Sequence, residues 1–388
     1  MQKAKKLKEY YARLPNIERA RHAAIEYAVD PSHEELAAIL GSAPQIFADE
    51  GVLGSAFASE LKNIPGAQII PLKAGEALKS AGFVKQILGT IEQRASGNLI
   101  IFGGGTIINL INYAVATFRE AGTESRFSRK LIILPTNSMS IADVAYGSLG
   151  LLNDDDNNLK NAKRKVIDPD MIILCEAVLA GGDDQMQKEG LVETLKHCLL
   201  QDRQTVSAVL EVLGSPTYDY RQVFDLAAWG LKLKADVVAS AHANPGTNVG
   251  LAKNYGHLHA TVIEESYEFG ALHGDCVIIG LIIDLKLAGE YGLARDLKDS
   301  LNGKLRDRIA AVMNKLPIAE LDAFYGRARR FRRTDGLFDV IELPEHGDYQ
   351  LFDDFSGFRT AAVDLQTIKG ELQSLRCELC SVNQNKVQ

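Results

Sequence analysis

The sequence has few cysteines, no long hydrophobic run and no excess of positive charge, and each shortage excludes a class of protein. The five cysteines are an odd number scattered over 388 residues, which is typical of a reducing compartment and excludes a disulfide-built scaffold. No run approaches the ~20 apolar residues of a membrane span. The charged start, residues 1–11, is not followed by the apolar core of a signal peptide. We therefore expect a cytoplasmic protein without a membrane segment.

The charge balance argues against a nucleic-acid partner. The formal net charge is −7 and the sequence pI is about 5.7, whereas nucleic-acid-binding domains are usually basic. Apolar residues make up 46% and charged residues 24% of the chain, an ordinary globular balance. A chain of this length favours two domains. An acidic protein that binds an anionic substrate must gather its lysines and arginines at the site.

The first half of the chain alternates short apolar runs with helical patterns. Residues 1–40 have a helical pattern, and the apolar runs follow at Gln45–Ala48, Gln68–Leu72, Asn98–Phe102, Lys130–Leu134 and Met171–Leu174. Runs of this length between helices predict a mostly parallel, Rossmann-like sheet covered on both faces. We therefore expect an α/β nucleotide-binding domain over residues 1–182, with a helical N-terminal extension at 1–40.

The second half shows mainly helical patterns and predicts an all-α domain over residues 183–388. A short β segment near Leu337–Leu343 is the one exception. The boundary between the two domains is expected near Gly181-Gly182, because the strand signals nearly stop there.

Two turns that follow apolar runs are candidate cofactor-binding segments. Gly103-Gly104-Gly105 follows one run and opens a helix, where glycines let a diphosphate approach the backbone and the helix N-terminus. The triplet is not a GxGxxG motif, and a tight turn without a ligand is the alternative. Thr136 and Asn137 follow the next run, where they either contact a cofactor or cap a helix.

Glu193, His257 and His273 form a candidate metal site. Glu193 lies in Gly190-Leu-Val-Glu-Thr-Leu-Lys196, one helical turn before Lys196, and each histidine adjoins a glycine. One carboxylate and two imidazoles suit Zn²⁺ and leave coordination positions open. The residue types alone are equally compatible with ordinary structural histidines.

These segments, in this order and spacing, resemble the dehydroquinate synthase superfamily of sugar phosphate cyclases over residues 35–345. Each motif is weak alone, and the ordered set is specific. The anchors are Gly75-Glu76-Ala-Leu-Lys79, Gly103–Thr106, Pro135-Thr136 with Asp143, Lys160-Asn161, Gly190–Lys196, Lys234–Val238, Asn254-Tyr-Gly-His257 and Leu272-His273-Gly274.

The resemblance implies a dehydroquinate synthase-like fold, with NAD bound by the α/β domain and Zn²⁺ or Co²⁺ bound by the helical domain. The residues that it assigns to NAD are Asp49, Glu76, Lys79, Gly104, Gly105, Thr106, Thr136 and Asn137, with Lys160 close by. It assigns the metal to Glu193, His257 and His273, and the substrate to Asp143, Asn161, Lys196, Lys234 and Asn254. It also implies a homodimer, in which Arg119 corresponds imperfectly to an arginine that reaches the partner's site.

The reaction implied by the resemblance is a cyclisation without net redox change. NAD⁺ transiently oxidises a secondary alcohol beside the metal, which acts as a Lewis acid. Phosphate then leaves by elimination, the hydride returns, and an intramolecular aldol step closes the ring. Lys196 and Lys234 suit the stabilisation of developing negative charge.

Four positions depart from the pattern of dehydroquinate synthases. Thr261 stands where a second histidine is usual, Leu149 replaces a lysine, Gly250 replaces an arginine, and Asn109 replaces an aspartate. Losing cationic groups leaves a substrate anion partly unpaired, which costs several kcal/mol. We therefore expect a sugar phosphate without a carboxylate, such as sedoheptulose 7-phosphate. One residue of Lys163-Arg164-Lys165 is a candidate replacement for phosphate binding, and a basic surface segment is the alternative.

Three other functions remain open from the sequence. They are 3-dehydroquinate synthase with a rearranged site, a metal-dependent polyol dehydrogenase of related architecture, and a homologue that has lost catalysis. Lys160-Asn161 and the glutamate at position 193 count against the dehydrogenase. The retained Glu193, His257 and His273 count against loss of catalysis.

Overall fold

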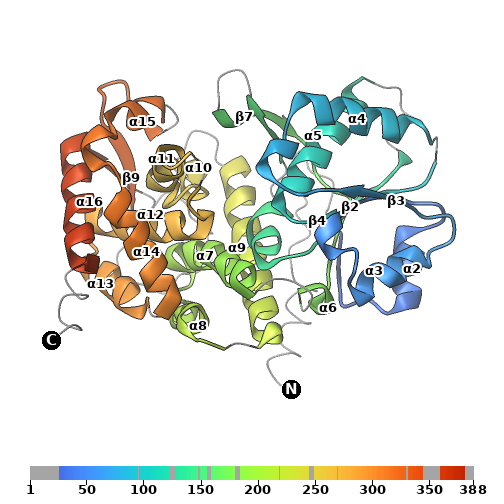
Figure 1. The fold of residues 1–388 in the computed structure, drawn as a ribbon, viewed down its shortest axis with the longest axis horizontal. Coiled ribbons are helices and arrows are strands. Elements are labelled where there is room, and N and C mark those ends of the chain that lie inside the picture. The colour runs from blue at the N-terminus through green and yellow to red at the C-terminus, as the bar shows by residue number, and fades with distance from the viewer. Residues whose placement is uncertain are drawn as a thin grey trace. The chain divides into compact units, whose positions relative to one another are not determined.

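The chain forms two compact units, which Figure 1 shows in a computed structural model. One unit is Met1–Gly190 with Asp219–Lys232, and the other is Leu191–Tyr218 with Leu233–Gln388. The structure describes residues 26–94, 96–121, 128–146, 149–154, 159–179, 184–217, 219–243, 249–268, 270–301, 303–328, 331–343 and 359–380. The boundary predicted near Gly181-Gly182 lies outside these residues.

The first unit is built on a six-stranded parallel sheet, which confirms the predicted α/β fold. The strands in spatial order are β1 (Glu26–Val29), β8 (Met171–Leu174), β5 (Leu131–Pro135), β4 (Leu99–Gly103), β2 (Gln45–Asp49) and β3 (Gln68–Leu72). After β3 the chain crosses to the other side of β2, so the strand order reverses between β2 and β4. In open α/β sheets such a reversal opens a ligand site at the carboxyl ends of the strands.

Helices cover both faces of the sheet, which explains why its central strands are apolar throughout. The helices of this unit are α2 (His33–Leu40), α3 (Ala56–Lys62), α4 (Ala81–Glu92), α5 (Gly105–Glu120) and α6 (Glu176–Leu179). Alternate strand residues such as Ile46, Ile100 and Ile132 form one core with α2 and α3. In Figure 1, α4 and α5 lie on the opposite side of the sheet.

A two-stranded hairpin that the sequence patterns did not predict also belongs to this unit. Its strands are β6 (Leu149–Asp154) and β7 (Leu159–Val166), paired antiparallel. The hairpin crosses α5 so closely that a Cβ on Gly150 would lie 2.1 Å from the backbone nitrogen of Tyr113. Gly150 is therefore needed for this contact. Lysines and arginine in β7 conceal its strand character, because charged residues are poor strand signals.

One expectation for the N-terminal segment is wrong. Glu26–Val29, part of the stretch predicted to be helical, forms β1 and pairs with β8. Pairing with β8, more than 140 residues later in the chain, outweighs the local helical propensity of this segment. Residues 33–40 do form the helix α2, capped by Ser32. The rest of the predicted helical extension, residues 1–25, lies outside the described residues.

The second unit is mainly helical, as predicted. Helices α7 (Asp184–Gln201) and α9 (Tyr220–Ala243) contribute residues to both units. The other helices are α8 (Arg203–Gly214), α10 (Val249–Ala252), α11 (His257–Ser266), α12 (His273–Leu287), α13 (Tyr291–Ser300), α14 (Gly303–Lys315), α15 (Asp322–Arg327) and α16 (Leu365–Cys380). The short β segment expected near residue 340 is β9 (Phe338–Glu342), which pairs with β10 (Arg359–Val363).

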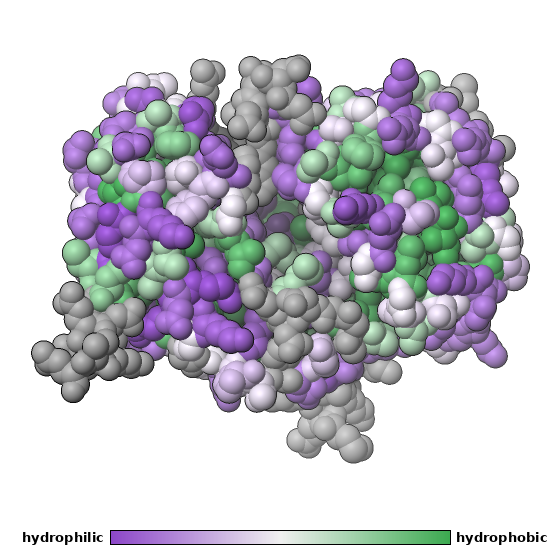
Figure 2. All heavy atoms as spheres, in the orientation of Figure 1, coloured by the Kyte–Doolittle hydropathy of each residue, from purple (hydrophilic) through white to green (hydrophobic). Residues whose placement is uncertain are grey.

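The molecular surface mixes hydrophilic and apolar side chains. On the face drawn in Figure 2, apolar surface of the first unit gathers around β3. This edge strand contains Pro71, which lacks the N–H that a further strand would need. In the described part of the chain, no helix is long and apolar enough to cross a membrane.

Candidate active site

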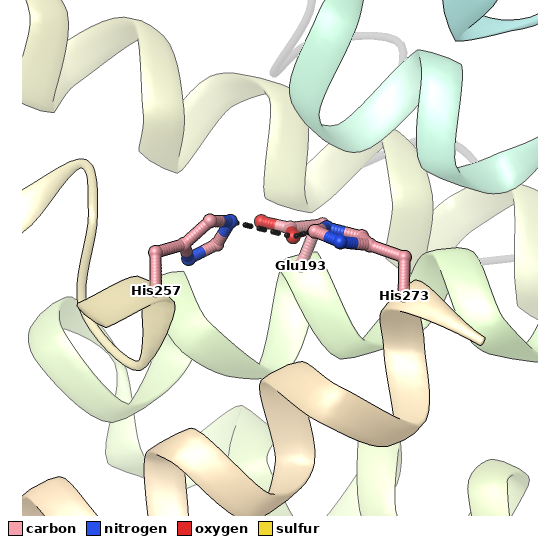
Figure 3. A group of neighbouring side chains, drawn as sticks. All are labelled: Glu193, His257 and His273. Atoms are coloured by element: carbon pink, nitrogen blue, oxygen red, sulfur yellow. Dashed lines mark hydrogen bonds and ion pairs between the residues drawn. The ribbon is translucent and has the colours of Figure 1, made fainter. Parts of the chain in front are cut away.

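The structure brings Glu193, His257 and His273 together. One ligand atom from each lies within 4.8 Å of the others. Figure 3 shows the two imidazoles on opposite sides of the carboxylate, with Glu193 on α7 and the histidines at the first residues of α11 and α12. Nε2 of His257 lies 3.4 Å and Nε2 of His273 3.2 Å from the same Glu193 oxygen, Oε1. All three residues belong to the second unit.

Each imidazole presents Nε2 to the carboxylate because its other nitrogen is already engaged. Nδ1 of His257 lies 3.1 Å from the carbonyl oxygen of Tyr255, and Nδ1 of His273 contacts Oε1 of Glu264. Metal-bound histidines characteristically donate their second N–H to a carbonyl or carboxylate, which fixes the tautomer and the ring orientation. The donor set and its orientation therefore fit a divalent cation such as Zn²⁺ or Co²⁺.

Glu264 also belongs to the candidate site, although the sequence patterns did not indicate it. It is nearly buried, with a side-chain exposure of 8%, and it lies seven residues after His257 on α11. That spacing places both residues on one helix face, with Thr261 between them. The seven-residue spacing between His257 and Glu264 could have indicated this residue, but an acidic residue on a helix is more often solvated than buried.

The electrostatics of the cluster favour a charged Glu193. Burial raises the pKa of this carboxyl, but Lys196, His257 and His273 outweigh burial and hold it well below its ordinary value. Burial lowers the pKa of His273, whereas Glu264 and Glu193 together raise it to about 10. An ionised carboxylate is the form that binds a cation.

Lys196 is buried beside the cluster. Its side chain is 1% exposed, its Nζ lies 2.5 Å from Oε2 of Glu193, and it donates to the carbonyl oxygen of Lys253 at 3.1 Å. Two other predicted substrate residues lie in the same unit. Lys234 is buried on α9, and Asn254 precedes α11, where its carbonyl accepts from the backbone N–H of His257.

In the first unit, the predicted NAD residues gather at the carboxyl ends of adjacent strands. Asp49 ends β2 and caps the turn that follows, with Oδ1 2.9 Å from the nitrogen of Gly51. Gly104 follows β4 and Thr136 follows β5, and the nitrogen of Thr136 donates to Gly103 at 3.2 Å. These strands lie next to each other in the order β5-β4-β2. The residues therefore line the edge at which the strand order reverses.

The glycine turn leaves the start of α5 accessible to a ligand. Gly104 is the N-cap of this 16-residue helix and makes no side-chain cap, so the first N–H groups, with Gly105 and Thr106, remain available for an anion. A Cβ on Gly104 would lie 2.7 Å from Nδ2 of Asn137. Asn137 also caps the next turn, since its Oδ1 accepts from Ser140 at 2.8 Å.

Gly190 explains how the start of α7, which belongs to the first unit, packs beside this edge. A Cβ at this position would lie 2.0 Å from the nitrogen of Met139, so only glycine fits. Oε1 of Gln187 also accepts from the backbone N–H of Ser138 at 3.0 Å. Glu193 follows Gly190 by one helical turn.

A second group of predicted residues meets where the β6–β7 hairpin packs on Glu76–Leu78. Nζ of the buried Lys79 lies 2.8 Å from Oε1 of Glu76 and 2.5 Å from Oδ1 of Asn161. Asn153 links the two segments, because it bonds to the backbone of Glu76, Lys79 and Asn161. Lys79 therefore holds the hairpin as well as being a candidate cofactor residue.

The remaining predicted residues are Asp143, Lys160 and Arg119. Asp143 lies in a π-helical turn, Ser140–Val144. Lys160 lies in β7, and its side chain is outside the described part. Arg119 donates to the carbonyl of Arg129 and pairs with Asp170 at 3.1 Å. Arg119 is thus engaged within its own unit, and its role at a partner's site stays a prediction.

The comparisons place this arrangement among known proteins. Residues 190–321 match the family model for the 3-dehydroquinate synthase C-terminal domain. The chain is 27% identical over 258 residues to the 3-dehydroquinate synthase of Pyrobaculum neutrophilum. The aligned region covers 65% of this chain and 69% of the relative.

Solved structures show the same fold. A 2-deoxy-scyllo-inosose synthase in complex with carbaglucose-6-phosphate, NAD⁺ and Co²⁺ has a TM-score of 0.69 at 17% identity, over 90% of this chain and 96% of that one. The 2-epi-5-epi-valiolone synthase of Streptomyces hygroscopicus subsp. jinggangensis 5008, with NAD⁺ and Zn²⁺, has a TM-score of 0.66 at 16% identity, over 92% and 98%. A probable glycerol dehydrogenase from Sinorhizobium meliloti 1021 is less similar, with a TM-score of 0.57 at 13% identity, over 91% and 97%. The chain therefore has a dehydroquinate synthase-like fold, and residues 190–321 are similar to the C-terminal domain of that family.

Proposed function

We propose that this protein is an NAD- and divalent-metal-dependent cyclase that converts a sugar phosphate without a carboxylate, such as sedoheptulose 7-phosphate, into a carbocycle. The observation that carries the proposal is the convergence of Glu193, His257 and His273 beside the buried Lys196. The similar cyclase structures, which contain NAD⁺ with Co²⁺ or Zn²⁺, support the two cofactors. A homodimer and a cytoplasmic location remain expectations from the sequence.

The residues of the chain divide into two roles. When bound, NAD supplies a transient oxidation and returns the hydride, while the cation polarises a substrate oxygen. The cation would be held by Glu193, His257 and His273. NAD would be held at the sheet edge formed by Asp49, Gly104–Thr106 and Thr136-Asn137. Lys196 would stabilise negative charge that develops on the substrate. Asp143, Asn161, Lys234 and Asn254 are the proposed substrate contacts.

The preference for a substrate without a carboxylate rests on Leu149. This residue begins β6, where its carbonyl accepts from Nδ2 of Asn112 at 3.2 Å, and its side chain carries no charge for an anion. Thr261, one turn after His257 on α11, likewise offers a hydroxyl instead of an imidazole. A substrate carboxylate near Leu149 or Thr261 would therefore lack the cationic partner that a lysine or a histidine provides.

The basic segment of β7 offers one candidate for the phosphate. Lys163 lies 3.8 Å from Asp154, and Lys165 pairs with Glu120, so both lysines balance nearby carboxylates. Arg164 is exposed on the opposite face of the strand. Arg164→Ala should raise the apparent KM for a phosphorylated sugar, and Lys163→Ala is the matched control. An unchanged KM in Arg164→Ala removes this role.

The proposed activity is tested with a panel of substrates in the presence of NAD⁺ and Co²⁺. The panel contains sedoheptulose 7-phosphate, glucose 6-phosphate, the carboxylate-bearing precursor of dehydroquinate, and glycerol. We expect inorganic phosphate and a cyclic product from a carboxylate-free sugar phosphate, with no accumulation of NADH. Phosphate release only from the dehydroquinate precursor would overturn the substrate preference, and net NADH formation from glycerol would indicate a dehydrogenase.

A further inference from the structure

A buried chain of polar side chains leads to the residue before His257. His259 is fully buried, with Nδ1 2.8 Å from the hydroxyl of Tyr325 and Nε2 3.0 Å from Oδ1 of Asp284. The other carboxylate oxygen of Asp284, Oδ2, accepts from the backbone N–H of Gly256 at 2.6 Å. Gly256 directly precedes His257. The side chains therefore run from α15 through α11 and α12 back to the residue before the candidate ligand.

Gly256 needs this support because its conformation is unusual. Its φ is +76°, in the left-handed region that favours glycine, and it makes the turn from which α11 begins. Its carbonyl packs so closely on α12 that a Cβ on Gly280 would lie 2.0 Å away. Gly280 removes the steric obstacle, and Asp284, one turn later on α12, supplies the hydrogen bond.

Helix α12 therefore carries the candidate ligand His273 and also contacts the start of α11, which carries the candidate ligand His257. His273 is the first residue of α12, and Gly280 and Asp284 follow it by seven and eleven residues, spacings that share one helix face. Because α12 is a rigid helix, the contact of Gly256 with Gly280 and Asp284 fixes His257 relative to His273.

We propose that Asp284, supported by His259 and Tyr325, is a positioning residue that sets the separation of the His257 and His273 imidazoles for cation binding. The inference rests on the proposed metal-dependent function. Neither His259 nor Tyr325 touches the cation position in this role. Tyr325 orients His259, His259 orients Asp284, and Asp284 holds the Gly256 N–H. Phe338, whose ring lies 5.5 Å from that of Tyr325, packs against the outer end.

The test compares Asp284→Asn and Tyr325→Phe with the unaltered chain in two measurements. The first is Co²⁺ titration followed by its visible absorption, which reports the coordination geometry. Misplaced supporting groups typically weaken metal binding by about 10–100-fold, and we expect such a loss with an altered Co²⁺ spectrum in Asp284→Asn. Tyr325→Phe should show a smaller change in the same direction. Glu378→Gln is the control, because it weakens α16 on α12 without touching Gly256.

The second measurement is hydrogen exchange of the Gly256 amide in the metal-free protein. We expect exchange at least about tenfold faster in Asp284→Asn than in the unaltered chain. Unchanged exchange, or unchanged Co²⁺ affinity and spectrum in Asp284→Asn, overturns the positioning role. If the unaltered chain binds no Co²⁺, the proposed function fails, while the exchange measurement still decides whether Asp284 holds Gly256.

Discussion

Nζ of Lys196 lies 2.5 Å from Oε2 of Glu193, one helical turn away on α7, and both side chains are only 1% exposed. The other carboxylate oxygen, Oε1, faces both imidazoles. One carboxylate thus divides its two oxygens between a resident cationic side chain and the position where a metal ion would bind. The charge of Lys196 keeps Glu193 ionised in a buried place, and the ionised carboxylate is the form that binds a cation.

Lys196→Met should destabilise the metal-free protein, because it leaves a buried carboxylate with less compensation. Removing one partner of a buried ion pair costs about 3–5 kcal/mol, and we expect a loss near the lower end because the two imidazoles remain. Added Zn²⁺ should then stabilise the variant more than the unaltered chain. Urea unfolding with and without Zn²⁺ measures both effects. Lys315→Met, at an exposed position on α14, should change stability by less than about 0.5 kcal/mol. Equal stability of Lys196→Met and the unaltered chain would contradict the ion-pair account.

Glu264→Gln tests whether the carboxylate behind His273 prepares this imidazole for a cation. The amide keeps the size of the side chain but accepts a weaker hydrogen bond from Nδ1. We expect a loss of about 10–100-fold in Zn²⁺ affinity, measured by competition with a chelator. Glu265→Gln is the matched control, since the neighbouring Glu265 pairs with Arg327 instead. A Zn²⁺ affinity that is equal in both variants would remove the role of Glu264.

Gly104→Ala should weaken NAD binding more than it changes stability. The φ of −81° suits any residue, but the new Cβ would lie 2.7 Å from Nδ2 of Asn137 and would fill the approach to the start of α5. We expect NAD affinity to fall by about tenfold or more, which corresponds to about 1.4 kcal/mol. Calorimetric titration with NAD⁺ measures the effect. Gly89→Ala on α4, where a Cβ meets nothing within 4 Å, should leave the NAD affinity unchanged. Unchanged affinity in Gly104→Ala would argue against a cofactor at this edge.

The ionisation of Glu378 should make part of the protein's stability depend on pH in the acid range. Burial raises the pKa of this carboxyl, but Lys286 and Lys298 outweigh burial and lower it from 4.5 to about 2. The stabilisation is therefore fully present above pH 4.5 and is lost as the pH falls through about 2. Because Glu378 is partly exposed, we expect its ionised carboxylate to contribute about 1 kcal/mol to the free energy of unfolding. Urea unfolding at several pH values should show Glu378→Gln less stable than the unaltered chain at neutral pH, with the difference shrinking between pH 4.5 and 2. A difference that stays constant over this range would contradict the assignment.

The parallel sheet and its cofactor edge could be predicted from the sequence because their signals are local. Apolar runs such as Leu99–Phe102 are covered on both faces, and the glycines that follow mark the turn into α5. The histidines could be predicted only with the resemblance, since His257 and His273 alone do not differ from structural histidines.

Other features depend on contacts between distant segments, which no local pattern encodes. β1 exists because it pairs with β8, and β7 is a strand despite its lysines because it pairs with β6. Glu264 and Asp284 are acidic residues on helices, where solvent exposure is the usual expectation. Their burial against His273 and Gly256 follows from how α11 packs on α12.

The most direct test of the account is the metal content of the purified protein after dialysis against Zn²⁺ and then against metal-free buffer. We predict about one ion per unaltered chain and almost none in Glu193→Gln or His273→Ala, with both variants folded by circular dichroism. An unaltered chain that retains no ion, or a Glu193→Gln protein that retains a full one, would contradict the central claim.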